Sequence, residues 1–324
     1  MGTFLKIIVK KICMNFSCKK NDSRGDHMKN LLIYYGYLSS FNSAVHQWVL
    51  EEVAVEMAKY DLLVFGDGVQ NTTHQDYSNA QVIVPRIKAL NPSAKIFGYV
   101  TLAQSYSDFK SKVDDWETLG ADSIFIDEAG YDYGTKETND RDAFNDKVDY
   151  VHGKNFYVFA NAWNIDHILG QENDPSYPND DWNANVAGSH LNTTDYVLLE
   201  SFGIFGVGTY ETHTQWHSRG SKLANYAHQF VAGSQIPNGD ANGQTKFDFL
   251  YLSAASWNLH GVGSSDTNYG SGGAVKLWTR PSVLDAYNPP VKNVSANKYY
   301  AYRTGQNLLF DYTVTPPTVT KETL

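Results

Sequence analysis

Short apolar runs alternate along the chain with longer segments in which apolar residues recur at helical spacing. A continuous apolar run of a few residues predicts a buried strand, whereas apolar positions three or four apart predict a helix that packs against it. The apolar runs are Leu31–Tyr37, Asp61–Gly66, Lys95–Val100, Ser123–Asp127, Phe156–Asn161, Tyr196–Glu200, Phe247–Leu252 and Ala274–Trp278. Because strands buried on both faces are apolar throughout, this pattern favours a parallel sheet.

The segments between these runs carry helix signals. Ser107 is placed to cap a helix that ends at Gly120, a residue suited to the left-handed position after a helix. The apolar positions of the predicted helices are Phe109, Val113, Trp116 and Leu119; Phe144, Val148 and Val151 before Gly153; and, nearer the start, Val45, Trp48, Val49, Val53 and Met57. Eight strands alternating with helices predict an α/β protein with a closed (β/α)8 (TIM) barrel. A doubly wound dinucleotide-binding sheet is disfavoured, since no G-x-G-x-x-G follows the first run.

The pattern divides the chain into three parts. Residues 28–288 form the predicted barrel, and its size agrees with the about 250 residues typical of this fold. Residues 1–27 are a short N-terminal extension, expected to be flexible or a targeting segment. Residues 289–324 form a C-terminal extension, in which apolar residues on either side of Gly305 predict a β-hairpin. The Thr/Pro-rich end beyond this hairpin is expected to be extended or disordered.

The N-terminal extension leaves the location of the protein open. It holds both cysteines, Cys13 and Cys18, so no disulfide framework is expected in the barrel. Phe4–Cys13 mixes basic and apolar residues, unlike the uninterrupted apolar run of a signal peptide. Met28 is an alternative start, because the folded pattern begins just after it. No later stretch has the 18 or so apolar residues of a transmembrane helix. We expect an extracellular or surface-associated protein, although the cysteine usage fits the cytosol equally well.

Composition narrows the class of partner. The 324 residues include 26 basic and 35 acidic side chains, giving a net charge of −9. No basic cluster interrupts the barrel region, so a nucleic acid or an anionic membrane is not expected as a partner. The chain also has 22 Tyr, 16 Phe and 7 Trp residues. This aromatic share suits a cleft that stacks on sugars and equally suits a large core. The oligomeric state stays open.

Polar and aromatic residues follow most of the predicted strands. They are Tyr35 and Tyr37 after the first, Asp67 after the second, Asp127 and Glu128 at the fourth, Asn161 and Trp163 at the fifth, Glu200 at the sixth and Trp257 after the seventh. In a (β/α)8 barrel the carboxyl ends of the strands converge on one pocket. We therefore expect these residues to meet there, in a pocket rich in carboxylates.

Asp127 and Glu200 are the candidate catalytic residues. Two carboxylates from nearby strands are the minimal machinery for breaking a glycosidic bond, since one protonates the leaving oxygen and the other attacks the anomeric carbon or activates water. A helix cap or a salt bridge explains either carboxylate alone equally well, but coincidence at two strands favours catalysis. Because neighbouring strand residues face opposite sides, at most one of Asp127 and Glu128 is expected to point into the pocket.

The other residues are candidates for substrate binding. This set comprises Tyr35, Tyr37, Asp67, Glu128, Asp132, Asn161, Trp163 and Trp257. Asp132 is a turn residue in the alternative interpretation, and each tryptophan has packing in the core as its alternative role.

Several other chemistries lack their motifs. The 10 histidines form no H-E-x-x-H or similar metal-binding spacing, so we expect no metal and no cofactor. The absence of a G-x-S-x-G elbow argues against a serine hydrolase of the α/β type. Gly270–Gly273 is the nearest candidate for a phosphate loop, and its position before the eighth predicted strand is unsuited to phosphate binding.

Three segments resemble one family of barrel enzymes. Gly120–Tyr133, with the sequence GADSIFIDEAGYDY, resembles the fourth-strand motif of glycoside hydrolase family 114, the endo-α-1,4-polygalactosaminidases, and of related TIM-barrel glycosidases. Ile96–Val100 and Val197–Phe202 resemble the third-strand and sixth-strand segments of the same family. The resemblance spans most of the barrel. It implies that Asp127 and Glu200 are the catalytic pair and that the substrate is a polysaccharide of amino sugars.

Two hypotheses follow for the function. In the first, the protein is a glycoside hydrolase that cleaves a carbohydrate polymer with Asp127 and Glu200, most simply with Glu200 as nucleophile and Asp127 as general acid and base. The sequence leaves these roles, the stereochemistry and the sugar open. In the second, the protein is a non-catalytic, carbohydrate-binding or structural barrel of a cell surface or virion, because a fold does not imply a function.

Overall fold

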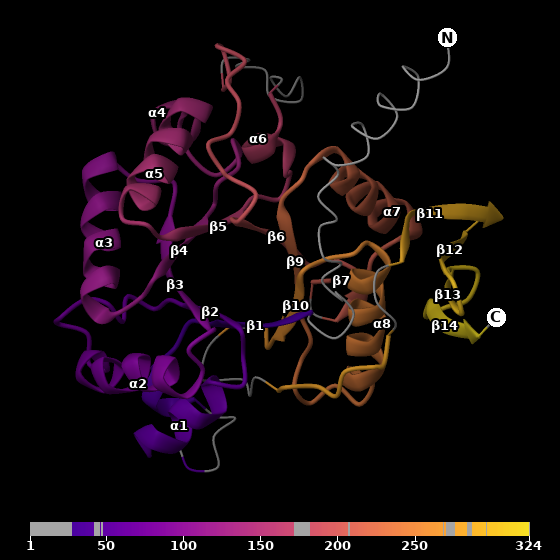
Figure 1. Cartoon of the computed structure of the whole chain (residues 1–324), viewed down its shortest axis with the longest axis horizontal. Helices are drawn as coiled ribbons and strands as arrows, with labels where there is room; N and C mark the ends of the chain where they lie inside the picture. The colour runs from indigo at the N-terminus through magenta and orange to yellow at the C-terminus, as the bar shows by residue number, and fades with distance from the viewer. Residues whose placement is uncertain are drawn as a thin grey trace, which may run out of the picture.

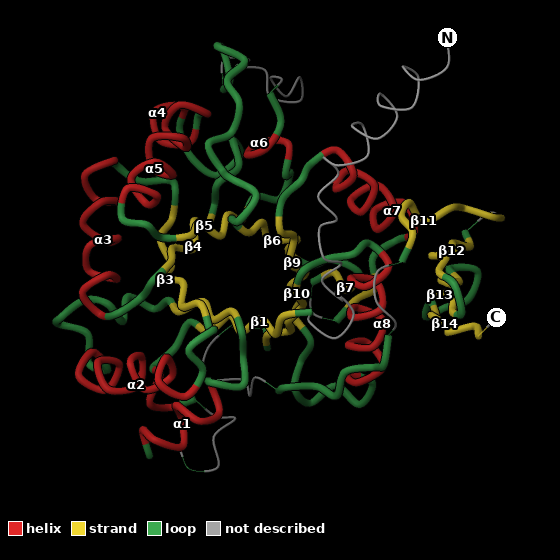
Figure 2. The backbone as a smooth tube through the Cα atoms, in the orientation of Figure 1, coloured by secondary structure: helices red, strands yellow, loops and turns green. Residues whose placement is uncertain are grey.

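Eight parallel strands close into a barrel in the order β1-β10-β9-β6-β5-β4-β3-β2 (Figures 1 and 2). The computed structural model describes residues 28–41, 46, 48–171, 182–206, 208–267, 269, 276–283, 287–295 and 297–323, so the N-terminal extension lies outside the described residues. The barrel strands are β1 (Lys29–Tyr34), β2 (Leu62–Phe65), β3 (Lys95–Thr101), β4 (Ser123–Asp127), β5 (Tyr157–Asn161), β6 (Tyr196–Glu200), β9 (Gln229–Gln235) and β10 (Gly261–Ser265). The predicted (β/α)8 barrel is confirmed.

Helices surround the barrel on the outside (Figure 2). They are α1 (Leu50–Met57), α2 (Tyr77–Leu90), α3 (Tyr106–Leu119), α4 (Lys136–Asn139), α5 (Arg141–Gly153), α6 (Asp166–Leu169), α7 (His213–Lys222) and α8 (Gly243–Ser256). Two 3-10 helices, η1 (Leu38–Ser40) and η2 (Leu223–Asn225), and a small hairpin of β7 (Ile204–Phe205) and β8 (Thr209–Tyr210) complete this part of the chain.

The alternation of side chains along each strand produces two cores. Residues that face the barrel interior form the smaller cluster of Leu31, Ile33, Leu62, Val64, Phe97, Phe125, Phe159, Tyr196, Leu198 and Val231. The intervening residues face outward and pack against the helices in a larger cluster. Since successive side chains of a strand point to opposite faces, the inward position recurs every second residue. This period decides which polar residues face the barrel axis at the carboxyl ends of the strands.

The predicted seventh and eighth strands are wrong. Phe247–Leu252 lies within α8, and the barrel uses β9 and β10 instead. Helix α8 contacts barrel strands on one side and the C-terminal sheet on the other, so its residues from Phe249 to Ser256 are all buried. A buried helix cannot be told from a buried strand by periodicity alone. Residues 276–278 have no regular structure, and 274 and 275 lie outside the described residues.

Strands β9 and β10 are hidden in the sequence by their small residues. A Cβ atom at Gly233 would lie 3.0 Å from Leu198 Cδ1, and one at Gly263 would lie 2.3 Å from the carbonyl oxygen of Leu31. Neighbouring strands approach too closely at these points for a larger side chain. The crowding that requires glycine also removes the β-branched residues that mark a strand.

Two helix starts differ from the prediction. Ser105, and not Ser107, caps α3, because its side chain accepts a hydrogen bond from the Asp108 amide. The end of α3 is confirmed, with Gly120 left-handed at a φ of 102°. Helix α1 begins at Leu50, after Trp48 adopts a φ of 68°, and Val45 lies outside the described residues.

The C-terminal segment forms an antiparallel sheet in the order β11-β12-β13-β14. Its strands are β11 (Asn288–Ser295), β12 (Lys298–Arg303), β13 (Gln306–Asp311) and β14 (Thr318–Thr323). The predicted hairpin is confirmed as β12 and β13 around Gly305, and the Thr/Pro-rich end contributes β14. The sheet packs beside α7 and α8 (Figure 1), where the ring of buried Trp216 lies 4.8 Å from that of Phe310.

Within the described residues, no helix is long and apolar enough to cross a membrane.

Gly98 permits a close contact between strand β3 and helix α3. A Cβ atom there would lie 2.2 Å from the ring of Trp116, whose Nε1 donates to the Tyr99 carbonyl at 3.0 Å. We predict that Gly98→Ala lowers the free energy of unfolding by roughly 1–3 kcal/mol, because overpacking forces the indole to move. The matched control is Gly153→Ala at the end of α5, where a Cβ would have nothing within 4 Å and a small stabilisation is expected. Urea unfolding followed by tryptophan fluorescence measures both. Equal stability of Gly98→Ala and the wild type would contradict the prediction.

Candidate active site

Three adjacent strands end on polar residues that face the barrel interior. Asp127 ends β4, Asn161 ends β5 and Glu200 ends β6. Each lies two residues after an inward-facing apolar side chain, and these are Phe125, Phe159 and Leu198. The strand period therefore places all three polar side chains in one layer, above the apolar filling of the barrel. This layer brings the predicted catalytic pair together with Asn161.

The Asn161 amide group bridges the two carboxylates. Its Nδ2 donates to Asp127 Oδ1 at 2.8 Å and to Glu200 Oε2 at 2.9 Å. An amide nitrogen carries two hydrogens, so each carboxylate receives one. The two acceptor oxygens therefore lie at most about 5.7 Å apart, the sum of these two distances. Asn161 is 7% exposed, so the bridge lies away from bulk water.

The surroundings of Asp127 raise the pKa of its carboxyl group. Burial raises the pKa of the Asp127 carboxyl group, and the nearby charge of Glu200 raises this pKa further. Hydrogen bonds from Asn161, from the Glu128 backbone and from Tyr99 act in the opposite direction, because they stabilise the carboxylate. The net direction is a raised pKa. Asp127 is therefore suited to hold a proton that it can donate.

Glu128 also reaches this region, although strand alternation predicted that at most one of Asp127 and Glu128 would. That prediction is wrong, because Glu128 leaves the strand conformation with a φ of 55°. Its Oε2 accepts a hydrogen bond from Thr101 Oγ1 at 2.6 Å, and Thr101 ends β3 two residues after Tyr99. The carboxylate of Glu128 therefore lies at the carboxyl end of β3, where the charges of both Asp127 and Glu128 act on the Tyr99 phenol.

Tyrosine rings form one wall of the site. The ring of Tyr35 lies 5.1 Å from that of Tyr99 and 5.4 Å from that of Tyr269. Burial raises the pKa of all three phenols, and the negative charges of Asp127 and Glu200 raise the pKa of Tyr35 and Tyr269 further. These hydroxyl groups therefore stay protonated at neutral pH and act as hydrogen-bond donors. Tyr35 was predicted to belong to the site, whereas Tyr99 and Tyr269 were not.

Tyr37 and Asp67 form a separate group around His74. The Tyr37 hydroxyl donates to Gln75 Oε1 at 2.9 Å, and its ring lies 5.0 Å from the imidazole of His74. Asp67 Oδ2 lies 3.5 Å from His74 Nε2. Both predicted residues thus lie at the carboxyl ends of β1 and β2, where they contact a histidine that sequence reasoning did not select.

Two exposed aromatic residues stand near the end of β6. Trp163 is 42% exposed and Phe205 is 41% exposed, and their rings lie edge to face at 5.8 Å. We call these two side chains the rim platform. The guanidinium group of Arg219 lies over the Trp163 ring at 4.8 Å. Exposed aromatic rings at the mouth of a barrel are suited to stacking against a sugar.

Asp132 lies in the loop after β4, beside His167. Its Oδ1 is 3.7 Å from His167 Nδ1, and the His167 ring stacks on Tyr131 at 4.4 Å. Asp132 therefore contributes to the organisation of this loop, and its side chain is 31% exposed.

Trp257 lies away from the predicted site. It follows α8 and precedes β10, so it belongs to a connection to the amino end of a strand, opposite the carboxyl ends. The side chain is 7% exposed, and its ring lies 5.7 Å from those of Trp216 and His217. The assignment to the site failed because it depended on the wrong seventh strand. Trp257 packs against Trp216, His217 and Gly220 of α7.

Sequence reasoning missed several residues of the mouth. Tyr99 and Thr101 follow inward-facing Phe97 at two-residue intervals, so strict alternation along β3 would have found them. Arg219 and its partner Glu211 lie in and before α7, where no sequence signal separates them from ordinary surface charges.

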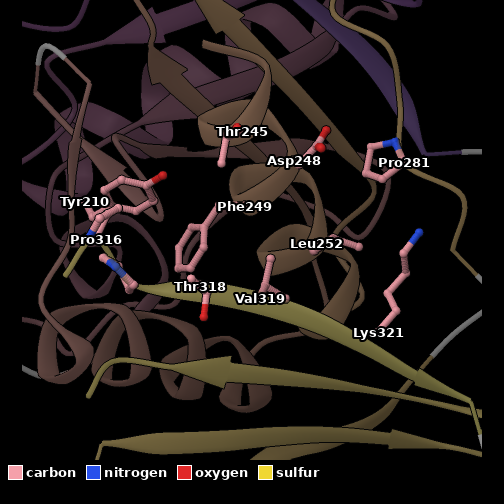
Figure 3. A pocket seen from close by; sticks show the side chains of 11 residues that line it. Tyr210, Thr245, Asp248, Phe249, Leu252, Pro281, Pro316, Thr318, Val319 and Lys321 are labelled. Carbon is pink, nitrogen blue, oxygen red and sulfur yellow. The ribbon is translucent and has the colours of Figure 1, made fainter. Parts of the chain in front are cut away.

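A cavity lies outside the barrel. It has a volume of about 300 Å³ and opens between α8 and β14 (Figure 3). Its lining comprises Tyr210, Thr245, Asp248, Phe249, Leu252, Pro281, Pro316, Pro317, Thr318, Val319 and Lys321. None of the predicted site residues belongs to it. Among the residues that the structure describes, no group of three or more His, Cys, Asp or Glu side chains is arranged to hold a metal ion.

Comparison with known proteins identifies the fold. No protein-family model matches the sequence, and no curated protein matches it. The structure of an AmyP variant in complex with maltotriose is similar, with a TM-score of 0.50, 8% identity and 86% of each chain covered. The intracellular xylanase TsXylA of Thermoanaerobacterium saccharolyticum has a TM-score of 0.45 and 13% identity, covering 75% of this chain and 86% of its own. A D-psicose 3-epimerase has a TM-score of 0.42 and 11% identity, covering 74% and 84%. At 8% identity the likeness shows the fold alone, so the reaction has to be inferred from the site.

The raised pKa of Asp127 has a consequence for stability. A carboxyl group whose pKa is higher in the folded state contributes stability below its unfolded pKa, and this contribution is lost as the pH rises through the folded pKa. We predict that Asp127→Asn raises the melting temperature at neutral pH, because it removes a buried charge that faces Glu200. The exposed Asp146 on α5 provides the control Asp146→Asn, expected to change little. Differential scanning calorimetry at pH 7 measures the three proteins, and a lower melting temperature for Asp127→Asn would refute the prediction.

Proposed function

We propose that the protein is a glycoside hydrolase that cleaves a polysaccharide with Asp127 and Glu200. The observation that carries this proposal is the Asn161 amide group, which holds the two carboxylates on one nitrogen at the mouth of the barrel. Hydrolysis of a glycosidic bond requires two carboxyl groups in different protonation states. Burial raises the pKa of Asp127, and this supports its assignment as the general acid. Glu200 is then the nucleophile.

The separation of the carboxylates supports a retaining mechanism. In retaining enzymes the two groups are about 5–5.5 Å apart, whereas inverting enzymes leave about 6.5–9.5 Å for a water molecule. The bridged oxygens of Asp127 and Glu200 are at most about 5.7 Å apart, since each is bonded to Asn161 Nδ2. This distance leaves little room for water between a sugar and the second carboxylate, so direct attack by Glu200 is favoured.

The reaction then proceeds in two steps. In the first, Asp127 transfers its proton to the glycosidic oxygen while a Glu200 oxygen bonds to the anomeric carbon, and the bond between that carbon and the leaving oxygen breaks. In the second, the Asp127 carboxylate accepts a proton from water as the water oxygen attacks the anomeric carbon and displaces Glu200. Asn161 keeps both carboxylates in place, Tyr99 donates a hydrogen bond to Asp127, and the Tyr35 hydroxyl group can bind one of the sugar's.

The charge at the mouth supports a neutral or cationic glycan. Asp127, Glu128 and Glu200 lie together, and Asp132 occupies the adjoining loop. A polyanionic sugar would be repelled by this group of carboxylates. Together with the resemblance of the fourth-strand segment to the polygalactosaminidases, the charge supports an amino-sugar polymer as the substrate. A polymer of this kind also supports an extracellular or surface-associated location.

We predict that the purified protein releases reducing ends from at least one polymer in a panel of amino-sugar and neutral polysaccharides. Asp127→Asn and Glu200→Gln should each lower the rate by about 100-fold or more, because each removes one of the two groups that move charge or protons. Asp146→Asn is the control and should retain full activity. NMR of the first product should show the same anomeric configuration as the cleaved bond of the substrate, because direct attack by Glu200 gives retention. Binding without release by any of the proteins would instead favour the non-catalytic barrel, and product of inverted configuration would refute direct attack by Glu200.

The alkaline side of the pH profile reports on Asp127. As general acid it must be protonated, so kcat falls as the pH rises through its pKa. The Tyr99 hydroxyl group stabilises the carboxylate and lowers this pKa in part. We predict that Tyr99→Phe moves the alkaline limb of kcat to higher pH, because the carboxylate of Asp127 loses a stabilising hydrogen bond. The control Tyr106→Phe changes an exposed residue of α3 and should leave the profile unchanged. If the alkaline limb of Tyr99→Phe lay at the same pH as in the wild type, or at a lower pH, Asp127 would not be the general acid.

A further inference from the structure

An arginine binds two consecutive carbonyl groups of the backbone turn after Glu200. Ser201 adopts a φ of 55° and Gly203 a φ of 75°, so the chain leaves the barrel directly after the candidate nucleophile. Arg219 Nη2 donates to the Glu200 carbonyl, and Nη1 donates to the Ser201 carbonyl at 3.2 Å. A non-glycine residue in the left-handed region is strained and persists when its surroundings fix it. Arg219 contributes to that fixation, together with the Ser201 amide, which donates to the Gly233 carbonyl at 2.6 Å.

Arg219 is itself held by a buried carboxylate. Its Nη1 lies 2.7 Å from Glu211 Oε1, and the Glu211 side chain is 1% exposed. The other oxygen of Glu211 accepts a hydrogen bond from the Gly203 amide at 2.6 Å. Glu211 therefore bonds to both the arginine and the turn. Removal of either charge of such a pair leaves its partner buried and uncompensated.

The same guanidinium group also contacts the rim platform. It lies over the Trp163 ring at 4.8 Å, and the Trp163 ring meets Phe205 at 5.8 Å. Trp163 follows β5, whereas Glu200 ends β6, so Arg219 connects two neighbouring strand ends. A planar guanidinium group can stack on an aromatic face and donate hydrogen bonds from its edge at the same time. Lysine, with a single ammonium group, cannot reproduce this geometry.

We propose that Arg219 is a positioning residue that couples sugar stacking on the rim platform to the placement of Glu200. This inference rests on the proposed function. A pyranose ring that stacks on Trp163 limits the movement of the indole and of the guanidinium group beneath it. Arg219 in turn fixes the backbone that carries the Glu200 carboxylate. The platform thereby contributes to the rate of the chemical step as well as to substrate binding.

Steady-state kinetics on the polymer found in the panel test this coupling. Arg219→Lys should lower kcat by about 10- to 100-fold, with a smaller change in KM, since a displacement of about 1 Å at a catalytic group costs up to about 100-fold. The matched control is Arg86→Lys, because Arg86 makes a forked pair with Glu51 on exposed helices and should leave both constants unchanged. In a double-mutant cycle, the variant that carries both Arg219→Lys and Trp163→Ala should lose less kcat than the product of the two single fold-losses. Effects that multiply independently, or a change in KM alone, would overturn the coupling.

A spectroscopic measurement tests the same link without activity. With 5-fluorotryptophan in the protein, the 19F resonance of Trp163 is identified by its loss in Trp163→Phe. That resonance should shift in Arg219→Lys and in Glu211→Gln, and stay in place in Arg86→Lys. If no polymer is hydrolysed but the shifts occur, the proposed function fails while the link between Arg219 and the platform stands. If hydrolysis occurs and neither variant moves the resonance or kcat, the inference about Arg219 fails alone. Should Arg219→Lys unfold, Glu211→Gln decides, because it retains the arginine.

Discussion

The contact on which the site depends is the one between the Asn161 amide group and the two carboxylates. Two like charges in a buried layer repel each other, and each loses hydration. Asn161 offsets part of this cost with its two N–H groups, one for each carboxylate. Because both hydrogens are used, the amide can adopt only one orientation. Strands β4, β5 and β6 are thereby tied together at their carboxyl ends, and the distance between Asp127 and Glu200 is fixed by a single nitrogen.

The barrel delivers these groups through its two-residue period. Tyr35, Tyr99, Asp127, Asn161 and Glu200 each continue an inward-facing series that is apolar below and polar at the mouth. The sequence could therefore predict the site on β4 to β6, where long apolar runs end on a polar residue. It could not reveal β9 and β10, because glycine replaces the apolar side chains where strands crowd together. The buried helix α8 imitated a strand, and Trp257 was misplaced as a result.

The supporting residues were harder to predict for another physical reason. Arg219 and Glu211 act through contacts between segments that only the fold brings together, since α7 returns to the end of β6. Nothing in the sequence separates this pair from an exposed ion pair such as Arg86 and Glu51. The difference is burial, and burial is a property of the tertiary structure. Positions set by strand period can thus be predicted, whereas those set by packing between distant segments cannot.

Backbone strain bears on the two hypotheses for the barrel only through the contacts that hold it. Asp67, Glu128 and Ser201 are non-glycine residues with φ values of 60°, 55° and 55°, and each lies at the carboxyl end of a barrel strand. Such a conformation costs about 1–3 kcal/mol, and a purely structural barrel could avoid it with glycine. Trp48, Asn155, Val186 and Asn258 share this conformation and follow no barrel strand directly, so strain alone does not mark a site. Glu128 and Ser201 differ from these residues in their contacts, because Glu128 turns its carboxylate to Thr101 and Arg219 binds the Ser201 carbonyl directly after Glu200. These contacts support the proposal that the carboxyl ends of the strands position charges for chemistry.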